Sequence, residues 1–209
     1  MAQYEYSDSR QTISFEPRKI TLQYQFTSDP DDLAFIARGH SADKLVFSSE
    51  GLYSTDTATI GFNIPDTLFP EVIEWEFKTP ADAYTYFTVY IWLKYALGGN
   101  NYFQFVMKGD GTFTVFEGIA VKAGSSTTFV SDTFTAGNYY PVKIYLLKEG
   151  NTDLRASVYV NESFRGDGIV YINDAGERAL LKSLFIQCES YSGTYGARLR
   201  NFKITFTKI

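Results

Sequence analysis

The sequence predicts an all-β protein, an antiparallel two-sheet β-sandwich of the jelly-roll type. Short apolar runs alternate with polar residues along most of the 209-residue chain, and clusters of Gly, Asn and Asp separate these runs as turns do. Aromatic residues make up 17% of the chain, which suits half-buried pleated surfaces. The only candidate for a helical turn is Ala175–Lys182. About a dozen short strands joined by turns are typical of a sandwich.

The first predicted strand covers Lys19–Phe26, where every second residue from Ile20 onward is apolar. The segment before it is polar and contains Pro17. We therefore expect residues 1–18 to be a flexible N-terminal arm or an attachment segment. Residues 19–209 then form a single β-sandwich domain, because one sandwich can accommodate that length.

Short strands are predicted next around Phe35, at Leu45–Phe47 and at Ala58–Phe62. A loop is predicted where Pro65 and Pro70 bracket two apolar residues, because proline lacks the N–H that a sheet ladder requires.

Two longer strands follow. In Glu71–Lys78, Ile73, Trp75 and Phe77 share one face, as in a half-buried strand. Residues Tyr84–Tyr95 form the longest predicted strand, about 40 Å at about 3.4 Å per residue. Its aliphatic face consists of Phe87, Val89, Ile91 and Leu93, and its reverse face of Tyr86, Thr88, Tyr90, Trp92 and Lys94.

The second half of the chain reads as hairpins. An Asp-Gly pair between Tyr102–Met107 and Thr112–Phe116 supplies the positive φ angles of a tight turn. A loop is expected at 122–127. The remaining predicted strands are Tyr140–Leu147, which pairs with Leu154–Val160, then Leu180–Cys188 and Leu199–Thr207.

Bulk composition excludes several classes of protein. The net charge is −5, and the absence of a basic stripe argues against a nucleic-acid partner. Cys188 is the only cysteine, so it has no internal disulfide partner. The N-terminus MAQYEYSDSR resembles no signal peptide, and no apolar run approaches the length of a membrane span. We expect the protein to be synthesised in the cytoplasm without a signal peptide, and a virion is one candidate for its final location.

Two stretches resemble the concanavalin A-like lectin and laminin-G group of jelly rolls. The first is Tyr102–Phe105, followed by a Gly-Asp-Gly hairpin and Phe113–Phe116. The second is Ala136–Tyr145, with a Gly-Xaa-aromatic-Tyr corner, followed by Ala156–Glu162, which contains Val-Tyr-Val-Asn at the end of a strand. Tyr139 stands where that group usually has Trp, and Glu162 where it usually has Gly. The resemblance covers about residues 71–207 and implies the fold. The group includes lectins, carbohydrate-binding modules, glycoside hydrolases, and virion fibre and decoration proteins, so the resemblance leaves function open.

Catalytic candidates are few. Glu74 and Glu76 lie on one strand face, and their side chains could approach the roughly 5–5.5 Å of a retaining glycosidase. The run around them does not match the Glu-Xaa-Asp-Xaa-Xaa-Glu pattern of sandwich glycosidases in the group. His40 is the only histidine, which excludes a multi-histidine metal site, and we interpret it as a surface residue. Cys188 lies on the same face of its predicted strand as Leu184 and Ile186, so we interpret it as a buried thiol.

The candidate ligand-binding residues are Tyr86, Tyr90 and Trp92, because the C–H face of a sugar packs on aromatic rings. The alternative is a buried layer or a subunit interface. The acidic turn Asp29, Asp31 and Asp32 lacks the spacing of a calcium cage. Arg165-Gly166-Asp167 spells an adhesion tripeptide, but its residues are ordinary in turns.

Three functional hypotheses remain. The first is a non-catalytic interaction or assembly module, such as a virion accessory protein of a phage, either a capsid decoration or a tail- or fibre-associated protein. The second is a stand-alone lectin or carbohydrate-binding module that uses an aromatic face. The third is a glycoside hydrolase or polysaccharide lyase. We expect a protein partner or self-association, with a glycan as the alternative ligand, and no cofactor, metal or membrane insertion.

Overall fold

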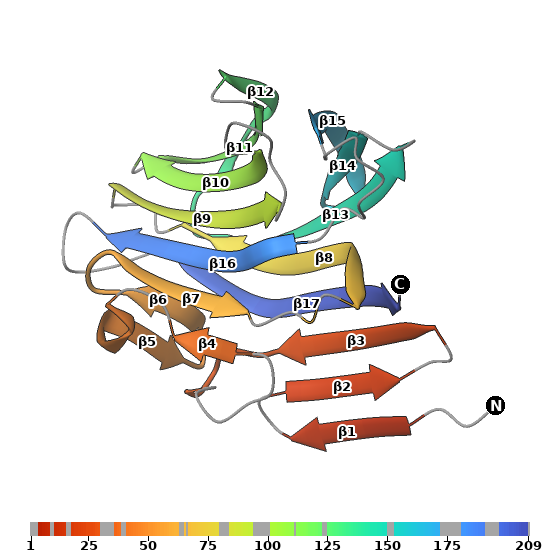
Figure 1. The fold of residues 1–209 in the computed structure, drawn as a ribbon. Coiled ribbons are helices and arrows are strands. Elements are labelled where there is room, and N and C mark those ends of the chain that lie inside the picture. Colours follow the sequence, from red (N-terminus) through yellow and green to blue (C-terminus); the bar gives the residue numbers. More distant parts are fainter. Residues whose placement is uncertain are drawn as a thin grey trace.

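The computed structural model is a sandwich of two antiparallel β-sheets that enclose one hydrophobic core (Figure 1), which confirms the predicted fold class. The structure describes residues 4–8, 11–15, 18–29, 36–38, 41–62, 65, 67–79, 84–93, 101–110, 112–122, 125–149, 153–171, 181–190 and 197–208.

The ten-stranded sheet has the order β1-β2-β3-β17-β8-β13-β14-β15, and a hairpin of β5 and β6 joins it through β17. Strands distant in sequence therefore lie side by side, with the last strand between β3 and β8. The bounds are β1 Tyr4–Asp8, β2 Gln11–Phe15, β3 Lys19–Tyr24, β5 Leu45–Ser48, β6 Gly51–Ser54, β8 Leu68–Lys78, β13 Tyr140–Glu149, β14 Asp153–Val160, β15 Ser163–Tyr171 and β17 Arg198–Lys208.

The seven-stranded sheet has the order β12-β11-β10-β9-β16-β7-β4. Its bounds are β4 Ile36–Arg38, β7 Ala58–Phe62, β9 Tyr84–Leu93, β10 Tyr102–Asp110, β11 Phe113–Lys122, β12 Ser125–Thr135 and β16 Leu181–Ser190. The 3-10 helix η1, Ala42–Lys44, is the one helical turn among the described residues. The predicted turn at Ala175–Lys182 falls largely outside them, and its last two residues belong to β16.

The core forms where the inward faces of the two sheets meet, and aromatic rings dominate it. Trp75 of β8 lies with its ring centroid 6.0 Å from that of Phe105 in β10 and 6.3 Å from that of Phe202 in β17. Such contacts add to the stabilisation from buried area. Trp75 and Phe77 are buried together with Ile73, so the predicted inward face of this strand is confirmed. Burial also raises the pKa of the Tyr24 hydroxyl, which belongs to the same core.

The predicted loop between Pro65 and Pro70 is wrong in its second half, because β8 already begins at Leu68. Pro70 lies opposite Phe206 in β17, directly at a register shift between Thr205 and Phe206. A β-bulge relieves the need for a regular ladder hydrogen bond. Proline is therefore tolerated inside this strand.

The predicted loop at 122–127 is also wrong in part, because β12 begins at Ser125. Phe129 of this strand lies against glycines of two neighbouring strands. A Cβ atom built on Gly166 would approach its carbonyl oxygen to 2.6 Å, and one on Gly168 would lie 2.6 Å from its Cε1 atom. A Cβ on Gly118 of β11 would lie 3.1 Å from its Cζ atom. The glycines thus leave the space that this ring and its backbone occupy.

The division into an arm at 1–18 and a domain at 19–209 stays a prediction. The described parts of the first segment include β1 and β2, which pair with each other and then with β3, so they extend the ten-stranded sheet rather than project from it. These three strands lie side by side at the bottom of Figure 1. In the described part of the chain, no helix is long and apolar enough to cross a membrane.

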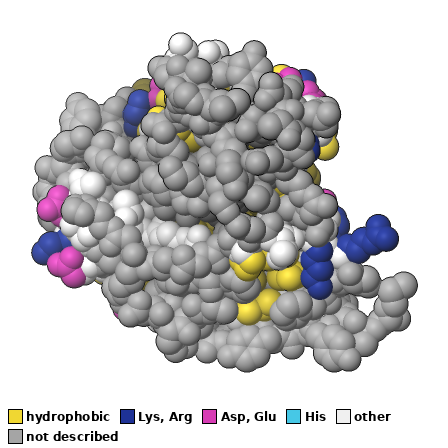
Figure 2. Space-filling model, in the orientation of Figure 1, with side chains coloured by type: hydrophobic (Ala, Val, Ile, Leu, Met, Phe, Trp, Pro, Cys, Tyr) yellow, Lys and Arg dark blue, Asp and Glu magenta, His cyan; other side chains and the backbone are white. Residues whose placement is uncertain are grey.

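Described charged side chains on the face seen in Figure 2 occur in small groups of both signs rather than in one continuous patch. Several charged side chains of the described surface are paired across strands, for example Lys108 with Glu117 at 2.5 Å and Lys19 with Glu71 at 3.0 Å. Exposed pairs of this kind contribute little to stability.

Candidate functional site

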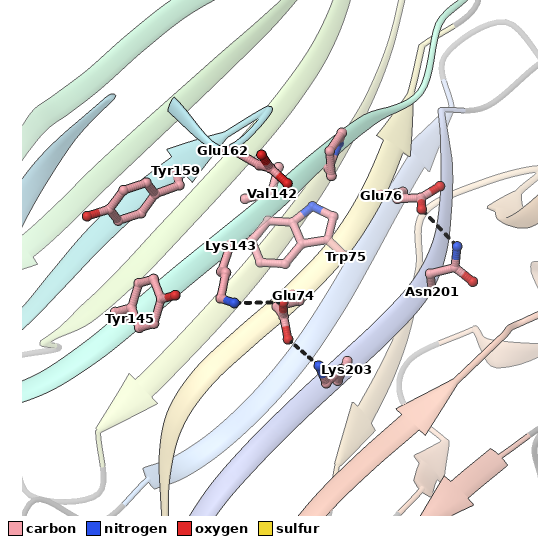
Figure 3. Close-up of a pocket in the computed structure, with 11 residues that line it drawn as sticks. Glu74, Trp75, Glu76, Val142, Lys143, Tyr145, Tyr159, Glu162, Asn201 and Lys203 are labelled. Atoms are coloured by element: carbon pink, nitrogen blue, oxygen red, sulfur yellow. Dashed lines mark hydrogen bonds and ion pairs between the residues drawn. The ribbon is translucent and has the colours of Figure 1, made fainter. Parts of the chain in front are cut away.

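A groove of about 630 Å³ lies on the outward face of the ten-stranded sheet. It crosses four adjacent strands, β17, β8, β13 and β14. Figure 3 shows charged side chains from β8, β13 and β17 meeting there, with tyrosines at one end. We call this feature the groove.

Strand alternation decides which residues reach the groove. In β13, Val142, Ile144 and Leu146 are buried in the core. Successive side chains of a strand point to opposite faces, so Lys143 and Tyr145 lie on the outward face. The same rule places Glu74 and Glu76 outward, because their neighbours in β8 are core residues.

Glu74 lies between two lysines on neighbouring strands. Its carboxylate is 3.2 Å from Nζ of Lys143 and 2.8 Å from Nζ of Lys203. Cross-strand register explains this, since both lysines are directly opposite Glu74. Burial by itself raises the pKa of Glu74, but hydrogen bonds and charge from Lys203 and Lys143 outweigh it and hold the pKa below its usual value.

The carboxylate of Glu76, two residues further along β8, is also held by hydrogen bonds from neighbouring side chains. It accepts hydrogen bonds from Nε of Arg200 at 2.6 Å and from Nδ2 of Asn201 at 2.9 Å. Asn201 has a φ of 53°, and β17 shifts register against β8 between Arg200 and Lys203. Asn tolerates this left-handed conformation better than most residues. The bulge therefore brings two consecutive donors to one carboxylate.

Two cations, Arg200 and Lys78, lie against one tyrosine ring between the groove and the β5–β6 hairpin. The Arg200 guanidinium lies 3.6 Å from the ring centroid of Tyr139, and Lys78 lies 5.2 Å from the same centroid. The Tyr139 hydroxyl donates to the backbone carbonyl of Glu50, and Lys78 pairs with the Glu50 carboxylate at 3.2 Å. Burial, and then the charge of Glu50, raise the pKa of Tyr139. These contacts attach the hairpin to the sheet.

Three aromatic side chains extend the groove on its other side. Tyr145 and Tyr159 have ring centroids 5.5 Å apart in a T-shaped arrangement, and Tyr159 and Phe164 are also 5.5 Å apart. We call these three residues the aromatic platform. Tyr145 is 41% exposed and Phe164 is 56% exposed, and Nζ of Lys143 lies 5.2 Å from the Tyr145 ring centroid.

The chemistry of Glu74 and Glu76 differs from that of a glycosidase pair. A general acid at neutral pH needs a raised pKa, whereas the pKa of Glu74 is lowered. Glu76 accepts two hydrogen bonds from protein groups. The groove does contain both carboxylates, but each is held by partners within the sheet.

The structure leaves the predicted ligand-binding residues untested. Tyr86, Tyr90 and Trp92 lie in β9, between β10 and β16, but their side chains are outside what the structure describes. Thr88, on the same face, is 1% exposed, and its cross-strand partner Val106 is 4% exposed. At these two positions the face is closed to solvent.

The other predicted candidates fall largely outside the described residues, which include neither His40 nor Asp31 and Asp32. Cys188 lies in β16, with its side chain not described. Across the ranges given above, no group of three or more His, Cys, Asp or Glu side chains could hold a metal ion.

The adhesion tripeptide lies in strand β15 rather than in a turn. Arg165 pairs with Asp132 of β12 at 2.8 Å, and Asp167 pairs with Arg155 of β14. Gly166 lies against Phe129, as described above. Both charged side chains are therefore engaged within the fold.

Sequence reasoning missed the aromatic platform. The outward position of Tyr145 followed from the alternation of β13, and Tyr159 from that of β14. Their contact depends on a diagonal register, in which Tyr159 faces Lys143 and Tyr145 faces Ser157. The pairing of the two strands was predicted, but their register was not.

Comparison by sequence finds no matching protein-family model and no matching curated protein. Comparison of structures finds similar folds at low identity. The CBM2 module of the evolved Dit of Lactobacillus casei BL23 phage J-1 matches with a TM-score of 0.56 and 12% identity, covering 96% of this chain and 98% of that one.

The Bacillus licheniformis beta-glucanase matches with a TM-score of 0.53 and 9% identity over 90% of this chain and 98% of its own. The globular domain of T. cruzi calreticulin matches with 0.52 and 10% over 90% and 87%. The likeness confirms that the chain has a concanavalin A-like jelly-roll fold, one shared by binding modules and enzymes.

Proposed function

We propose that the chain is a non-catalytic interaction module that binds a glycan on the outward face of the ten-stranded sheet. The aromatic platform is the observation that carries the proposal. Large aromatic side chains that pack edge to face and yet remain exposed are what a sugar ring needs, because its C–H face stacks on an aromatic ring.

The neighbouring groove supplies the polar partners that would orient such a ligand. Each lysine ammonium has three N–H donors. Lys203 contacts Glu74, and Lys143 contacts both Glu74 and Tyr145. Further N–H groups remain for hydroxyl oxygens of a ligand. The engaged state of Glu74 and Glu76 supports a binding role over hydrolysis.

The test is glycan binding by the intact chain and by variants of the platform. We expect Tyr145→Ala and Phe164→Ala each to weaken the tightest glycan found on an array by about tenfold or more. Phe113→Ala is the matched control, because Phe113 is 49% exposed but belongs to the other sheet, outside the groove. Its affinity should equal that of the unmodified chain.

Two results would contradict the proposal. One is an array on which the unmodified chain binds no glycan. The other is a bound glycan whose affinity falls as much with Phe113→Ala as with Tyr145→Ala. Release of reducing ends from the bound polysaccharide would contradict the non-catalytic part.

We further propose a phage virion as the setting, with the chain as an accessory protein that assembles through a protein partner or self-association. The similarity to a module of a phage Dit, over nearly the whole of both chains, supports this proposal. Mass spectrometry of purified virions from the source phage should detect the chain. Its absence from virions, together with a monomeric mass in solution by light scattering, would argue against it.

A further inference from the structure

The turn between β14 and β15 has an unfavourable backbone conformation for its sequence. Two residues, Asn161 and Glu162, connect Val160 to Ser163, and both have positive φ angles, 51° and 61°. This is the pattern of a type I′ turn, in which Gly is the preferred second residue and Asn the preferred first. Asn161 therefore fits its position, whereas Glu162 adopts a conformation that is unfavourable for a residue with a Cβ atom.

The turn is fixed beside the groove. The backbone N–H of Asn161 donates to the carbonyl of Pro141 in β13 at 3.0 Å. Glu162 lines the groove, whereas Asn161 does not. Figure 3 shows Glu162 near Val142 and Tyr159, on the side of the groove away from Lys203. The strained residue is thus the one whose side chain meets the candidate ligand space.

The Glu162 carboxylate differs from the other two in the groove. Glu74 is held by two lysines and Glu76 by Arg200 and Asn201. Glu162 forms no ion pair or side-chain hydrogen bond with any residue that the structure describes, and its side chain is exposed. Among the described residues, none occupies its two oxygens, which are therefore open to a ligand.

An ionised carboxylate only accepts hydrogen bonds, so its ligand must donate them. Hydroxyl groups of a sugar do so, and two neighbouring hydroxyls can engage both oxygens. A carboxylate or sulfate on the ligand would instead be repelled by the like charge. Strain retained at one position is a recognised mark of function, and here a less strained residue, glycine, would remove the acceptor.

We infer that Glu162 is a specificity-determining contact of the glycan site, and that it selects neutral, hydroxyl-rich glycans over those that carry uronic acids. The inference rests on the proposed glycan-binding function and names its ligand class. Lys143 and Lys203 donate to sugar oxygens at the sheet surface, while Glu162 accepts from sugar hydroxyls at the turn.

The experiment compares three variants with the unmodified chain, by calorimetric titration with neutral and uronic-acid oligosaccharides and by thermal unfolding. We expect Glu162→Gly to weaken neutral-glycan binding about tenfold, the effect of losing a hydrogen bond to a charged group. The same change should raise Tm by about 1–3 °C, because the turn prefers glycine there. Glu162→Gln should keep the Tm and narrow the preference for neutral over uronic glycans.

Asn161→Gly is the matched control. It removes a side chain from the same turn, also at positive φ, but outside the groove, so glycan affinity should not change. If Glu162→Gly binds as the unmodified chain does while Tyr145→Ala loses binding, the inference is overturned and the proposed function stands. A preference of the unmodified chain for uronic glycans overturns the inference in the same way. If no glycan binds at all, the proposed function is contradicted first.

Discussion

The two sides of strand β15 have opposite surroundings. On the outward side, Phe164 is more than half exposed and contacts Tyr159 by an open edge-to-face arrangement. A register shift against β14 between Phe164 and Gly166 reverses the alternation, so Gly166 and Gly168 lie on the inward side. These glycines have no side chains, and Phe129 of β12 fills the space that they leave. The same strand thus presents a ring to solvent and receives a ring from the opposite sheet. Exposed aromatics are available for binding, whereas glycines under a ring serve packing.

Changing the inward side should have the largest effect on stability. In Gly168→Ala the new Cβ atom would lie 2.6 Å from Cε1 and 2.7 Å from Cγ of Phe129. Overpacking of this kind typically lowers the free energy of unfolding by about 1–3 kcal/mol, and we expect about 2 kcal/mol from urea unfolding. Glycan affinity of the folded variant should be unchanged.

The control for this prediction is a second change at the ring. Phe129→Leu in the Gly168→Ala background should recover part of the lost stability, because a smaller side chain relieves the contact. Additive losses in the double-mutant cycle would show that the two residues do not interact.

The charged centre of the groove should have a smaller, pH-dependent effect. Glu74→Gln leaves Lys143 and Lys203 without their shared counter-ion and should lower the free energy of unfolding by about 0.5–1 kcal/mol at neutral pH. The pKa of Glu74 is lower in the folded chain than its ordinary value of 4.5. Its contribution is therefore complete above about pH 4.5 and is lost as the pH falls through the folded pKa.

Urea unfolding of both proteins between pH 3 and pH 7 measures this difference. The gap between the unmodified chain and Glu74→Gln should close toward acid. A gap that stays constant or widens there would mean that the ion pairs contribute no net stability.

The outward side of β15 should show the smallest effect on stability. Phe164→Ser removes an exposed ring, so the free energy of unfolding should change by less than about 0.5 kcal/mol. Glycan binding should fall instead, which reverses the pattern expected for Gly168→Ala in the same strand. Equal loss of stability in the two variants would remove the distinction between the two sides.

The fold could be predicted because much of its information is local. Alternation identified the inward face of Lys19–Phe26 and of Glu71–Lys78, and the Asp-Gly pair marked a hairpin. The errors arose where a partner strand decides the outcome. Pro70 lies inside a strand because β17 shifts register opposite it, and β15 looked like a turn because its glycines make room for a ring of another strand.

The site was harder to predict for the same reason. Glu74 was identified as a candidate for catalysis. The two lysines that pair with it lie on β13 and β17, which flank β8 in the sheet but are distant from it in sequence. The sequence showed that Glu162 stands where similar proteins usually have glycine. Only the structure shows that this side chain lines the groove, where it could contact a ligand. The predicted aromatic face of β9 stays a prediction.

The position of β17 has a consequence for how the protein is made. This strand, residues 198–208, pairs with β3 at residues 19–24 on one side and with β8 at 68–78 on the other. During synthesis, β3 and β8 therefore cannot be joined in one sheet until residues 198–208 have left the ribosome. Such long sequence separation slows folding, and we expect nascent chains that lack β17 to depend on chaperones.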